Sequence, residues 1–350
     1  MNSSAVYGGT EKWAVTAARL LKARGHRVYF AYRYPVMREY AENEGLETIR
    51  FPLQNDADIY SIIKLMKTFS RLDLQAVVST KVKEYWLGTV AAKLSGRKSI
   101  LRLGINRSVK NKWKNRKIYG AWADGIVVNA EAIADTLAST GFIPRQKISL
   151  IYNGVACPDA LPEFRTSPDP FIYIYVGSLI PRKNVDVLIQ NFSELIRLTP
   201  GKPLKLRIAG DGHERARLER LVRELGLENS VQFMGHRKDV PQLLQQAHGF
   251  VLLSENEGFP NAALEAMARG VPVIMSRVAG AEEIIGSGDN GLLVNTGGEG
   301  EVLKAMQMLL HDPELRLRIR NRAFQKVKIE LTYQAMAEKL EDVLYGIING

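Results

Sequence analysis

The sequence is poor in cysteine, and no part of it is apolar for long. Cys157 is the only cysteine among 350 residues, which excludes an internal disulfide and a zinc cluster built on cysteines. No apolar run approaches the roughly 18 residues that a membrane-spanning helix needs. The first residues, MNSSAVYGG, lack the basic and apolar regions of a secretory signal. We therefore expect a cytoplasmic protein without a membrane span.

Acidic residues are scarce in the first half of the chain. Residues 1–160 contain 25 Lys or Arg against 13 Asp or Glu, a net charge of +12, whereas residues 161–350 contain 23 against 24, a net charge of −1. The stretch 102–122 has no acid and mixes basic residues with aromatic ones, which suits an anionic membrane surface. Nucleic acid is the competing partner, and a solvated basic face is the third interpretation. The residues concerned are Arg102, Arg107, Lys110, Lys112, Trp113, Lys114, Arg116, Lys117, Ile118, Tyr119 and Trp122.

The length and the 46% hydrophobic content suit two domains of roughly 150 to 180 residues. Residues 34–155 alternate between short apolar segments and helical patterns, which predicts a doubly wound α/β domain. Residues 156–170 contain four prolines, a composition typical of a linker. A second series of strand, loop and helix units follows it. The chain ends in an amphipathic helical pattern over 331–348.

Two polar segments in the first domain predict helix starts. Gly8 and Gly9 form a loop, Thr10 is placed to cap a helix, and Gly25 ends that helix. Asp56-Ala57-Asp58 matches a metal-binding D-x-D pattern, but three residues alone are a weak signal. The helical pattern IYSIIKLMKTF follows directly, so a helix cap is the better interpretation.

The most informative stretch is 249–291, a strand, a polar loop and a helix. Asn261 is placed to cap this helix, which we expect to continue to a stop at Gly270. Glu257 in the loop and Glu265 in the helix are eight positions apart and could face one crevice. Alternatively, Glu265 complements the helix dipole and Glu257 is a solvated charge.

The phrase EGFPNAALEAMARGVPVI, followed by GAEEIIGSGDNGLLV, resembles the signature of glycosyltransferase family 4. The Gly-Gly-x-Glu loop at 8–11, KISLIYNGV and VGSLIPRKNVD carry the same resemblance. It implies an α/β GT-B fold, with two facing Rossmann-like doubly wound domains and a cleft between them. Residues 1–155 would bind the acceptor and residues 171–330 the nucleotide-sugar. The helix at 331–350 would cross back to pack on the first domain.

Arg182 and Lys183 lie in a loop between a strand and a helix, where cations can meet a diphosphate. The resemblance implies that this pair holds the leaving diphosphate and that Glu257 binds hydroxyls of the transferred sugar. Glu265 would bind the ribose, and His236 is a bystander. The remaining donor-binding positions that it implies are Gly8, Gly9, Ser178, Arg237, Lys238, Gly258, Phe259 and Asn261.

Three features depart from the family pattern. The apolar strand expected before the glycine loop is missing, because only six residues precede Tyr7. Many family members have an arginine at the position of Ser178, so we assign that role to Arg182. The segment ILRLGINRS lacks the histidine that many members have after the fifth strand.

These observations together predict a retaining, metal-independent hexosyltransferase that needs no cofactor. It would move a sugar from a UDP- or GDP-linked donor to a cell-envelope acceptor, namely lipopolysaccharide, a lipid-linked glycan or a polysaccharide. We expect it at the inner face of the membrane, bound through 102–122. A GT-B nucleotide-sugar 2-epimerase is the alternative enzyme. A nucleic-acid binder is disfavoured because the motifs lie in the neutral half and no RNA-binding signature accompanies the basic stretch.

Overall fold

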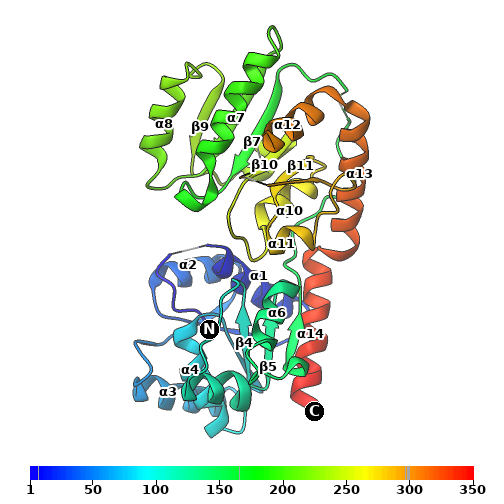
Figure 1. Cartoon of the computed structure of the whole chain (residues 1–350). Coiled ribbons are helices and arrows are strands. Elements are labelled where there is room, and N and C mark those ends of the chain that lie inside the picture. Colours follow the sequence, from blue (N-terminus) through cyan, green and yellow to red (C-terminus); the bar gives the residue numbers. More distant parts are fainter. Residues whose placement is uncertain (7, 165, 296, 298–299) are drawn as a thin grey trace. The chain divides into compact units, whose positions relative to one another are not determined.

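The structure is a computed structural model, and it describes residues 1–6, 8–164, 166–295, 297 and 300–350. Arg165, inside the predicted linker, lies outside the described residues. The chain divides into two compact units (Figure 1). Unit 1 comprises Met1–Gly154 and Tyr333–Gly350, and unit 2 comprises Val155–Thr332. Each unit contains a parallel sheet.

Unit 1 contains a four-stranded parallel sheet in the order β3-β4-β5-β6 and a separate parallel pair, β1-β2. Its strands are β1 (Tyr29–Tyr32), β2 (Glu47–Arg50), β3 (Ala76–Ser79), β4 (Lys98–Leu103), β5 (Gly125–Val128) and β6 (Ile148–Leu150). Its helices are α1 (Gly9–Ala23), α2 (Pro35–Asn43), α3 (Ile59–Arg71), α4 (Val82–Leu94), α5 (Trp113–Asn115), the π-helix η1 (Arg116–Trp122), α6 (Glu131–Ala138), η2 (Arg145–Lys147) and α14 (Tyr333–Asn349). Parallel neighbours need crossover connections, and the helices between these strands supply them.

Both faces of the four-stranded sheet are covered, as the continuous apolar runs of its strands predict. Ile100 and Val127 pack with residues of α1 and α14. Leu101 and Ile126, one position along each strand, pack instead with residues of η1 and α6. Alternate residues of one strand therefore serve two cores.

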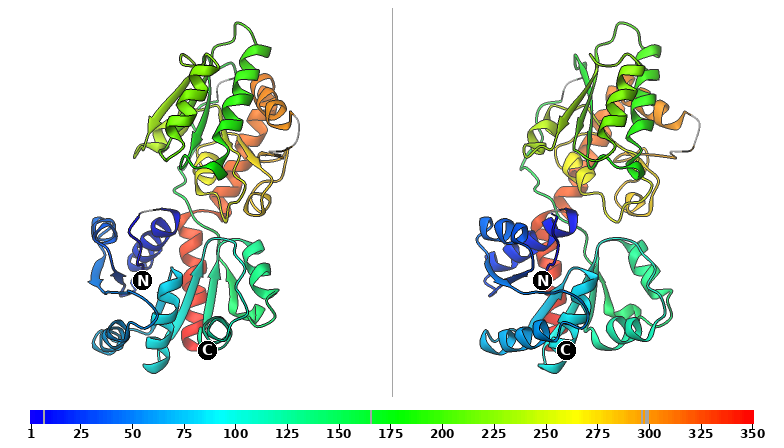
Figure 2. Two further views of the ribbon diagram at one scale, coloured as in Figure 1. Left: turned by 60° about the vertical axis from the view of Figure 1, so that its left-hand side comes forward. Right: turned by 90° about the vertical axis from the view of Figure 1, so that its left-hand side faces the viewer.

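Helix α14 belongs to unit 1 although it follows unit 2 in the sequence, which is the predicted return of the C-terminal helix. Figure 2 shows this helix, in red, beside the strands of unit 1. Met336 and Leu340 are buried in the same cluster as Trp13 of α1. At the surface, Glu341 accepts hydrogen bonds from Arg24 and His26, at the end of α1 and just beyond it, at 2.6 Å each. The apolar stripe predicted at the end of the chain is thus buried against α1.

The two predicted helix starts in unit 1 have different outcomes. Asp58 caps α3, because its carboxylate accepts from the amide of Ser61 at 2.9 Å, which confirms the helix-cap interpretation of the D-x-D pattern. The cap predicted at Thr10 is wrong. Gly8 is the N-cap of α1, and the Glu11 carboxylate accepts from its amide at 3.1 Å. Thr10 therefore lies inside the first turn.

Unit 2 contains a six-stranded parallel sheet in the order β12-β11-β10-β7-β8-β9. The strands are β7 (Phe171–Val176), β8 (Leu204–Ala209), β9 (Val231–Gly235), β10 (Gly249–Leu252), β11 (Val273–Ser276) and β12 (Leu292–Val294). The helices are η3 (Pro181–Lys183), α7 (Val185–Leu198), α8 (Arg215–Glu224), α9 (Val240–Gln245), α10 (Asn261–Met267), α11 (Ala279–Glu282), α12 (Glu301–His311) and α13 (Pro313–Glu330).

The strand order of unit 2 reverses at β7. The chain adds β8 and β9 on one side of β7 and then returns to add β10, β11 and β12 on the other side. In open α/β sheets, ligands bind outside the carboxyl ends of the strands where the order reverses. The loops that follow β7 and β10 flank this point.

Candidate functional site

The loops after β7 and β10 are joined by hydrogen bonds between residues far apart in the sequence. The amide of Glu255 donates to the carbonyl of Arg182 at 2.9 Å. The side-chain amide of Asn184 donates to the carbonyl of Leu253 at 3.1 Å. Asn184 has a left-handed backbone, with φ of 49°, and this residue ends η3 and starts α7. The two loops therefore form one structure at the carboxyl edge of the sheet.

Lys183 and Glu257 form an ion pair inside this structure. Their side chains are 12% and 14% exposed, so the pair is largely removed from water. The hydroxyl of Ser254 donates to the same Glu257 oxygen at 2.8 Å, and the hydroxyl of Ser276 donates to the Ser254 carbonyl. Removing one partner of a pair shielded in this way leaves an uncompensated charge. The carboxylate and the ammonium are thus held in one geometry.

Arg182 presents its guanidinium beside this pair. One of its nitrogens donates to the carbonyl of Asn256 at 3.0 Å, and the residue as a whole is exposed. A guanidinium carries five N–H donors in a planar fork, so it can bind an anion while it keeps this bond. The structure therefore places Arg182, Lys183 and Glu257 together.

Ser178 lies at the end of β7, exposed, and its carbonyl accepts a hydrogen bond from the hydroxyl of Tyr175 at 2.8 Å. Burial raises the pKa of Tyr175, and the charge of Glu257 acts in the same direction. The phenol therefore keeps its proton and remains a donor. Its hydrogen bond to the Ser178 carbonyl holds the backbone of the loop after β7 in place.

Glycines let the backbone approach closely at two places near the carboxyl ends of the strands. A Cβ at Gly210 would lie 1.8 Å from the carbonyl oxygen of Gly177, which joins the loops after β7 and β8. A Cβ at Gly280 would lie 2.2 Å from the carbonyl oxygen of Gly258, so the first turn of α11 lies against the loop after β10. Such backbone contacts leave no room for a side chain at either glycine.

Glu265 is in α10, directly after the loop that contains Glu257. Its side chain is half-buried, and its carbonyl accepts from Arg269 at 3.0 Å. The cap predicted at Asn261 is wrong, because Pro260 is the N-cap and Asn261 is the first residue of the helix. The helix ends at Met267, and the turn after it closes at Gly270 with φ of 67°, the expected stop.

Arg237 and Lys238 follow β9, which β8 and β7 separate from β10. Both residues are exposed, as is His236. The Arg237 guanidinium binds Asp239 through two hydrogen bonds of 2.8 and 2.6 Å. Strand order thus places this pair at the far side of the reversal point from Glu257.

Gly8 and Gly9 belong to unit 1, where they start α1. Next to them is a polar cluster that the sequence analysis missed. Glu11 is 4% exposed and pairs with Lys81. The signal was present in the sequence, since Glu11 is the fourth residue of the Gly-Gly-x-Glu loop.

Arg102 contradicts its predicted place in a membrane-facing patch. It is 2% exposed, packs 4.5 Å from the centre of the Trp13 ring and donates to Asn153 at 3.1 Å. Burial lowers its pKa to about 10. A single arginine inside the apolar run SILRL was the sequence signal for a buried position.

The rest of the basic stretch divides into buried and exposed residues. Ile118 and Tyr119 are core residues of η1, which corrects their assignment to the surface. Trp113 is 70% exposed. The basic residues that remain exposed beside it are Arg107, Lys110, Lys112, Arg116 and Lys117. Within the described part of the chain, no helix is long and apolar enough to cross a bilayer.

Two parallel α/β units of this kind, with returning C-terminal helices, define the GT-B class of fold and confirm the predicted fold class. The crystal structure of Anabaena Alr3699/HepE in complex with UDP matches with a TM-score of 0.84 at 20% identity. The match covers 99% of this chain and 100% of that one. Identity this low shows the shared fold alone.

Two family profiles together match most of the sequence. The Glycosyltransferase Family 4 profile matches residues 7–157, and the Glycosyl transferases group 1 profile matches residues 159–326. The chain therefore belongs to the group 1, family 4 glycosyltransferases, as its motifs predicted.

Curated relatives match over part of their length. N-acetyl-alpha-D-glucosaminyl L-malate synthase of Bacillus anthracis is 32% identical over 187 residues, which are 53% of this chain and 48% of the synthase. Lipopolysaccharide core biosynthesis glycosyltransferase LpsE of Rhizobium meliloti is 27% identical over 228 residues, 65% of each chain. The chain thus spans between about half and two thirds of the length of these relatives.

Proposed function

We propose that this glycosyltransferase moves a hexose, with retention of anomeric configuration, from a UDP- or GDP-linked donor to a cell-envelope glycan. The observation that carries this function is the ion pair between Lys183 and Glu257, held beside Arg182 where the strand order reverses. Cations for a diphosphate and a carboxylate for sugar hydroxyls then lie in one site. The UDP bound by Alr3699/HepE supports a nucleotide donor.

In this reaction the bond between the sugar and the diphosphate breaks, and negative charge grows on the leaving diphosphate. Arg182 and Lys183 stabilise that charge more strongly as it grows, which lowers the barrier. At about 4 Å and an effective dielectric constant of 20, one unit charge pair contributes roughly 4 kcal/mol. These two side chains take the role that a metal ion has in other transferases.

The carboxylates have binding roles. Glu257 accepts hydrogen bonds from hydroxyls of the transferred sugar, and Glu265 accepts from the ribose. Each charged hydrogen bond contributes about 1.5–3 kcal/mol. Backbone amides of Gly258, Phe259 and Asn261 complete the cradle, and the leaving diphosphate takes the proton of the attacking hydroxyl on the same face of the sugar. No carboxylate nucleophile is required.

The proposed acceptor and membrane contact rest on one relative and on the exposed side chains of residues 107–117. The relative LpsE, a lipopolysaccharide core biosynthesis glycosyltransferase, supports an acceptor in the cell envelope. Trp113 and the exposed basic residues around it suit an anionic lipid surface, where each Lys or Arg contributes up to about 1 kcal/mol. In this proposal the protein works at the inner face of the membrane, and residues 107–117 make the contact.

The experiment that tests this function is a mass-spectrometric search for sugar transfer. The protein is incubated with a panel of UDP- and GDP-sugars and envelope glycans, with and without a chelator. We expect transfer from one donor and an equal rate with the chelator. Donor turnover without transfer to any acceptor would indicate the 2-epimerase instead. Binding of RNA at 150 mM salt without donor binding would favour a nucleic-acid protein.

A further inference from the structure

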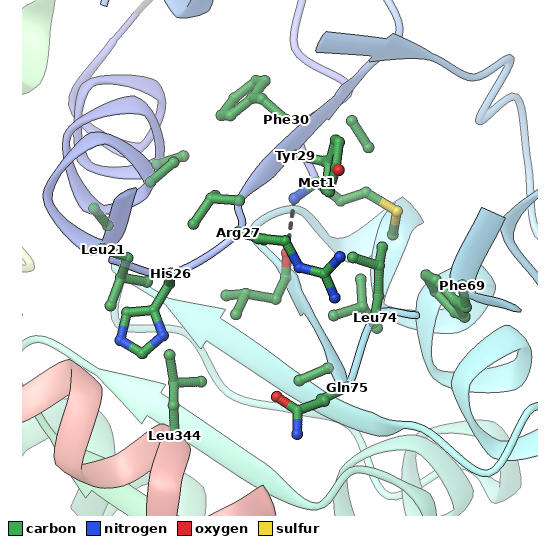
Figure 3. Close-up of a pocket in the computed structure, with 18 of the residues that line it drawn as sticks. Met1, Leu21, His26, Arg27, Tyr29, Phe30, Phe69, Leu74, Gln75 and Leu344 are labelled. Carbon is green, nitrogen blue, oxygen red and sulfur yellow. Dashed lines mark hydrogen bonds between the residues drawn. The ribbon is translucent and has the colours of Figure 1, made fainter. Parts of the chain in front are cut away.

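Each unit contains a cavity, and the two cavities differ in their lining. The cavity of unit 1 has a volume of about 330 Å³, and much of its wall consists of apolar side chains such as Phe30, Leu74 and Leu344 (Figure 3). The Met1 amine lies within it and donates to the Val78 carbonyl at 2.7 Å, the dashed line in the figure. The cavity of unit 2 has a volume of about 410 Å³, and its lining includes three arginines. This second cavity therefore suits a ligand of opposite charge.

The cavity of unit 2 lies at the amino ends of three strands. Its lining includes Ile172 near the start of β7, His248 just before β10, and Pro272 just before β11. These strands are parallel, so the loops at their carboxyl ends lie at the opposite edge of the sheet. Those loops contain Lys183 and Glu257. The cavity is therefore separate from the site at Lys183 and Glu257.

Helix α13 contributes two buried arginines to this cavity. Arg316 and Arg320 are one helical turn apart and only 2% and 6% exposed. Among the described residues, neither forms an ion pair, and both donate to neutral backbone carbonyls. An arginine side chain keeps its proton in proteins. Two like charges thus lie in the interior without a carboxylate beside them, and burial of an unpaired charge is costly.

Arg320 keeps donors that the protein does not use. Its Nη2 donates to the Pro162 carbonyl, whereas its Nε and Nη1 have no hydrogen-bond partner in the part of the chain that the structure describes. The Phe164 ring centre lies 5.5 Å from the guanidinium carbon, and the ring attracts the cation without neutralising it. Arg320 therefore has both charge and hydrogen-bond donors for a ligand.

The other polar side chains of the lining favour the same kind of ligand. Arg269 is a third, half-buried cation. The Nδ1 of His248 accepts from the Ile172 amide at 3.0 Å, so the neutral ring carries its hydrogen on Nε2. The acids of the lining, Glu163 and Asp169, are exposed. The buried part of the wall is thus positive, and its acids remain in water.

We propose that this cavity binds the phosphate group of a small molecule, free or as an ester, against Arg320, with Arg316 and Arg269 as further positive charges. A phosphate dianion neutralises the two buried arginines, and its oxygens accept hydrogen bonds from a guanidinium fork. A volume of about 410 Å³ holds a phosphate with a small organic part. The same arginines bond the carbonyls of Pro162 and Thr166, so the ligand and the segment that leads into β7 share these side chains.

The test is a calorimetric titration of inorganic phosphate into the full chain at constant ionic strength. The proteins compared are wild type, Arg320→Met and the matched control Arg318→Met. Arg318 is an exposed arginine of the same helix that donates to the Gly288 carbonyl at 3.4 Å. We expect a Kd below about 1 mM in wild type and in the control, and binding at least tenfold weaker in Arg320→Met. Equal binding by all three proteins would overturn the site.

Arg182→Met separates this cavity from the proposed donor site. We expect this variant to retain the phosphate binding that Arg320→Met loses. The reverse pattern would overturn the proposal, and neither result depends on the sugar-transfer assay.

Hydrogen exchange of the wild-type protein makes the test independent of whether Arg320→Met folds. Phosphate should slow the exchange of amides in the loops 245–248 and 269–272 at least threefold and leave 177–184 unchanged. Slowing confined to 177–184 would contradict the cavity as the site.

A comparison of ligands identifies the source of the phosphate group. Tighter binding of glycerol 3-phosphate than of inorganic phosphate would indicate an ester, and equal affinity would indicate free phosphate. Tighter binding of malonate than of both would overturn the assignment to phosphate.

Discussion

Lys183 and Glu257, which are 74 positions apart in the sequence, form an ion pair that Ser254 completes by donating to the same carboxylate oxygen. The pair links Lys183, the residue proposed to bind the diphosphate, to Glu257, the residue proposed to bind the sugar. Each group positions the other, so a change in one is expected to disturb both contacts. The coupling can therefore be measured with variants of Lys183 and Glu257.

Replacing Lys183 with methionine keeps the length of the side chain and removes its charge. We expect kcat to fall by about 10²–10³, the usual effect of removing one group that stabilises transition-state charge. Transfer kinetics measure the change. Lys205→Met is the matched control, because Lys205 is an exposed lysine of the same unit whose ammonium donates to the Asn229 carbonyl at 2.5 Å. Equal loss in both variants would contradict the role of Lys183.

The double variant of Lys183→Met and Glu257→Gln tests the coupling. Because the two side chains share one ion pair, their effects on kcat/KM should not add, with an interaction energy of about 1–3 kcal/mol. A double-mutant cycle measures it. Strictly additive losses would show that the two residues act on substrate independently.

Gly210→Ala should destabilise unit 2, because the new Cβ would meet the Gly177 carbonyl oxygen at 1.8 Å. We expect a loss of about 3 kcal/mol in the free energy of unfolding, as for severe overpacking. Gly226→Ala is the control. Gly226 also has a positive φ, 66°, but no atom lies within 4 Å of its Cβ position, so about 1 kcal/mol is expected. Equal costs in urea denaturation would argue against the close approach of the loops.

Asp58→Ala should lower the free energy of unfolding by about 1 kcal/mol at pH 7, through loss of the α3 cap. Burial alone would raise the pKa of Asp58, but hydrogen bonds from Gln54 and Ser61 lower it overall. The contribution is therefore complete above the unfolded pKa of about 3.9 and is lost as pH falls through the lower folded pKa.

Thermal unfolding from pH 7 down to pH 2 measures this effect, and the gap between wild type and Asp58→Ala should close at the acid end. Asp56→Ala is the control from the same motif. Asp56 pairs with Lys114 at the surface, so its loss should cost less than about 0.5 kcal/mol. A constant gap for Asp58→Ala across the whole range would contradict the charged cap.

Trp113→Ala should weaken binding to vesicles of anionic lipid by about tenfold, because its exposed ring is the apolar element within the basic patch. Cosedimentation at two salt concentrations measures the affinity, which should fall as salt rises. Ile329→Ala is the control, since Ile329 is an exposed apolar residue of unit 2 at 71%. Equal vesicle binding by both variants would contradict a membrane contact through residues 107–117.

Local patterns in the sequence predicted the alternating strands and helices of doubly wound α/β domains, and the resemblance to glycosyltransferase family 4 implied the GT-B fold class. Alternating apolar strands and helical segments depend on neighbouring residues, so periodicity reveals them. The D-x-D segment shows the same locality, because Asp58 caps a helix that begins at the next residue. The cap positions at Thr10 and Asn261 were wrong because N-cap identity depends on backbone angles, which the residue type alone does not decide.

The tertiary structure decided which distant residues meet. Sheet order places β10 beside β7, and that placement brings Glu257 to Lys183. The same level of structure buries Arg102 under Trp13 and sets Met1 between two sheets. Strand order and burial arise from pairing between segments tens of residues apart. The sequence by itself therefore determined the class of this protein and its charged motifs, whereas folding in three dimensions determined which of those charges form a site.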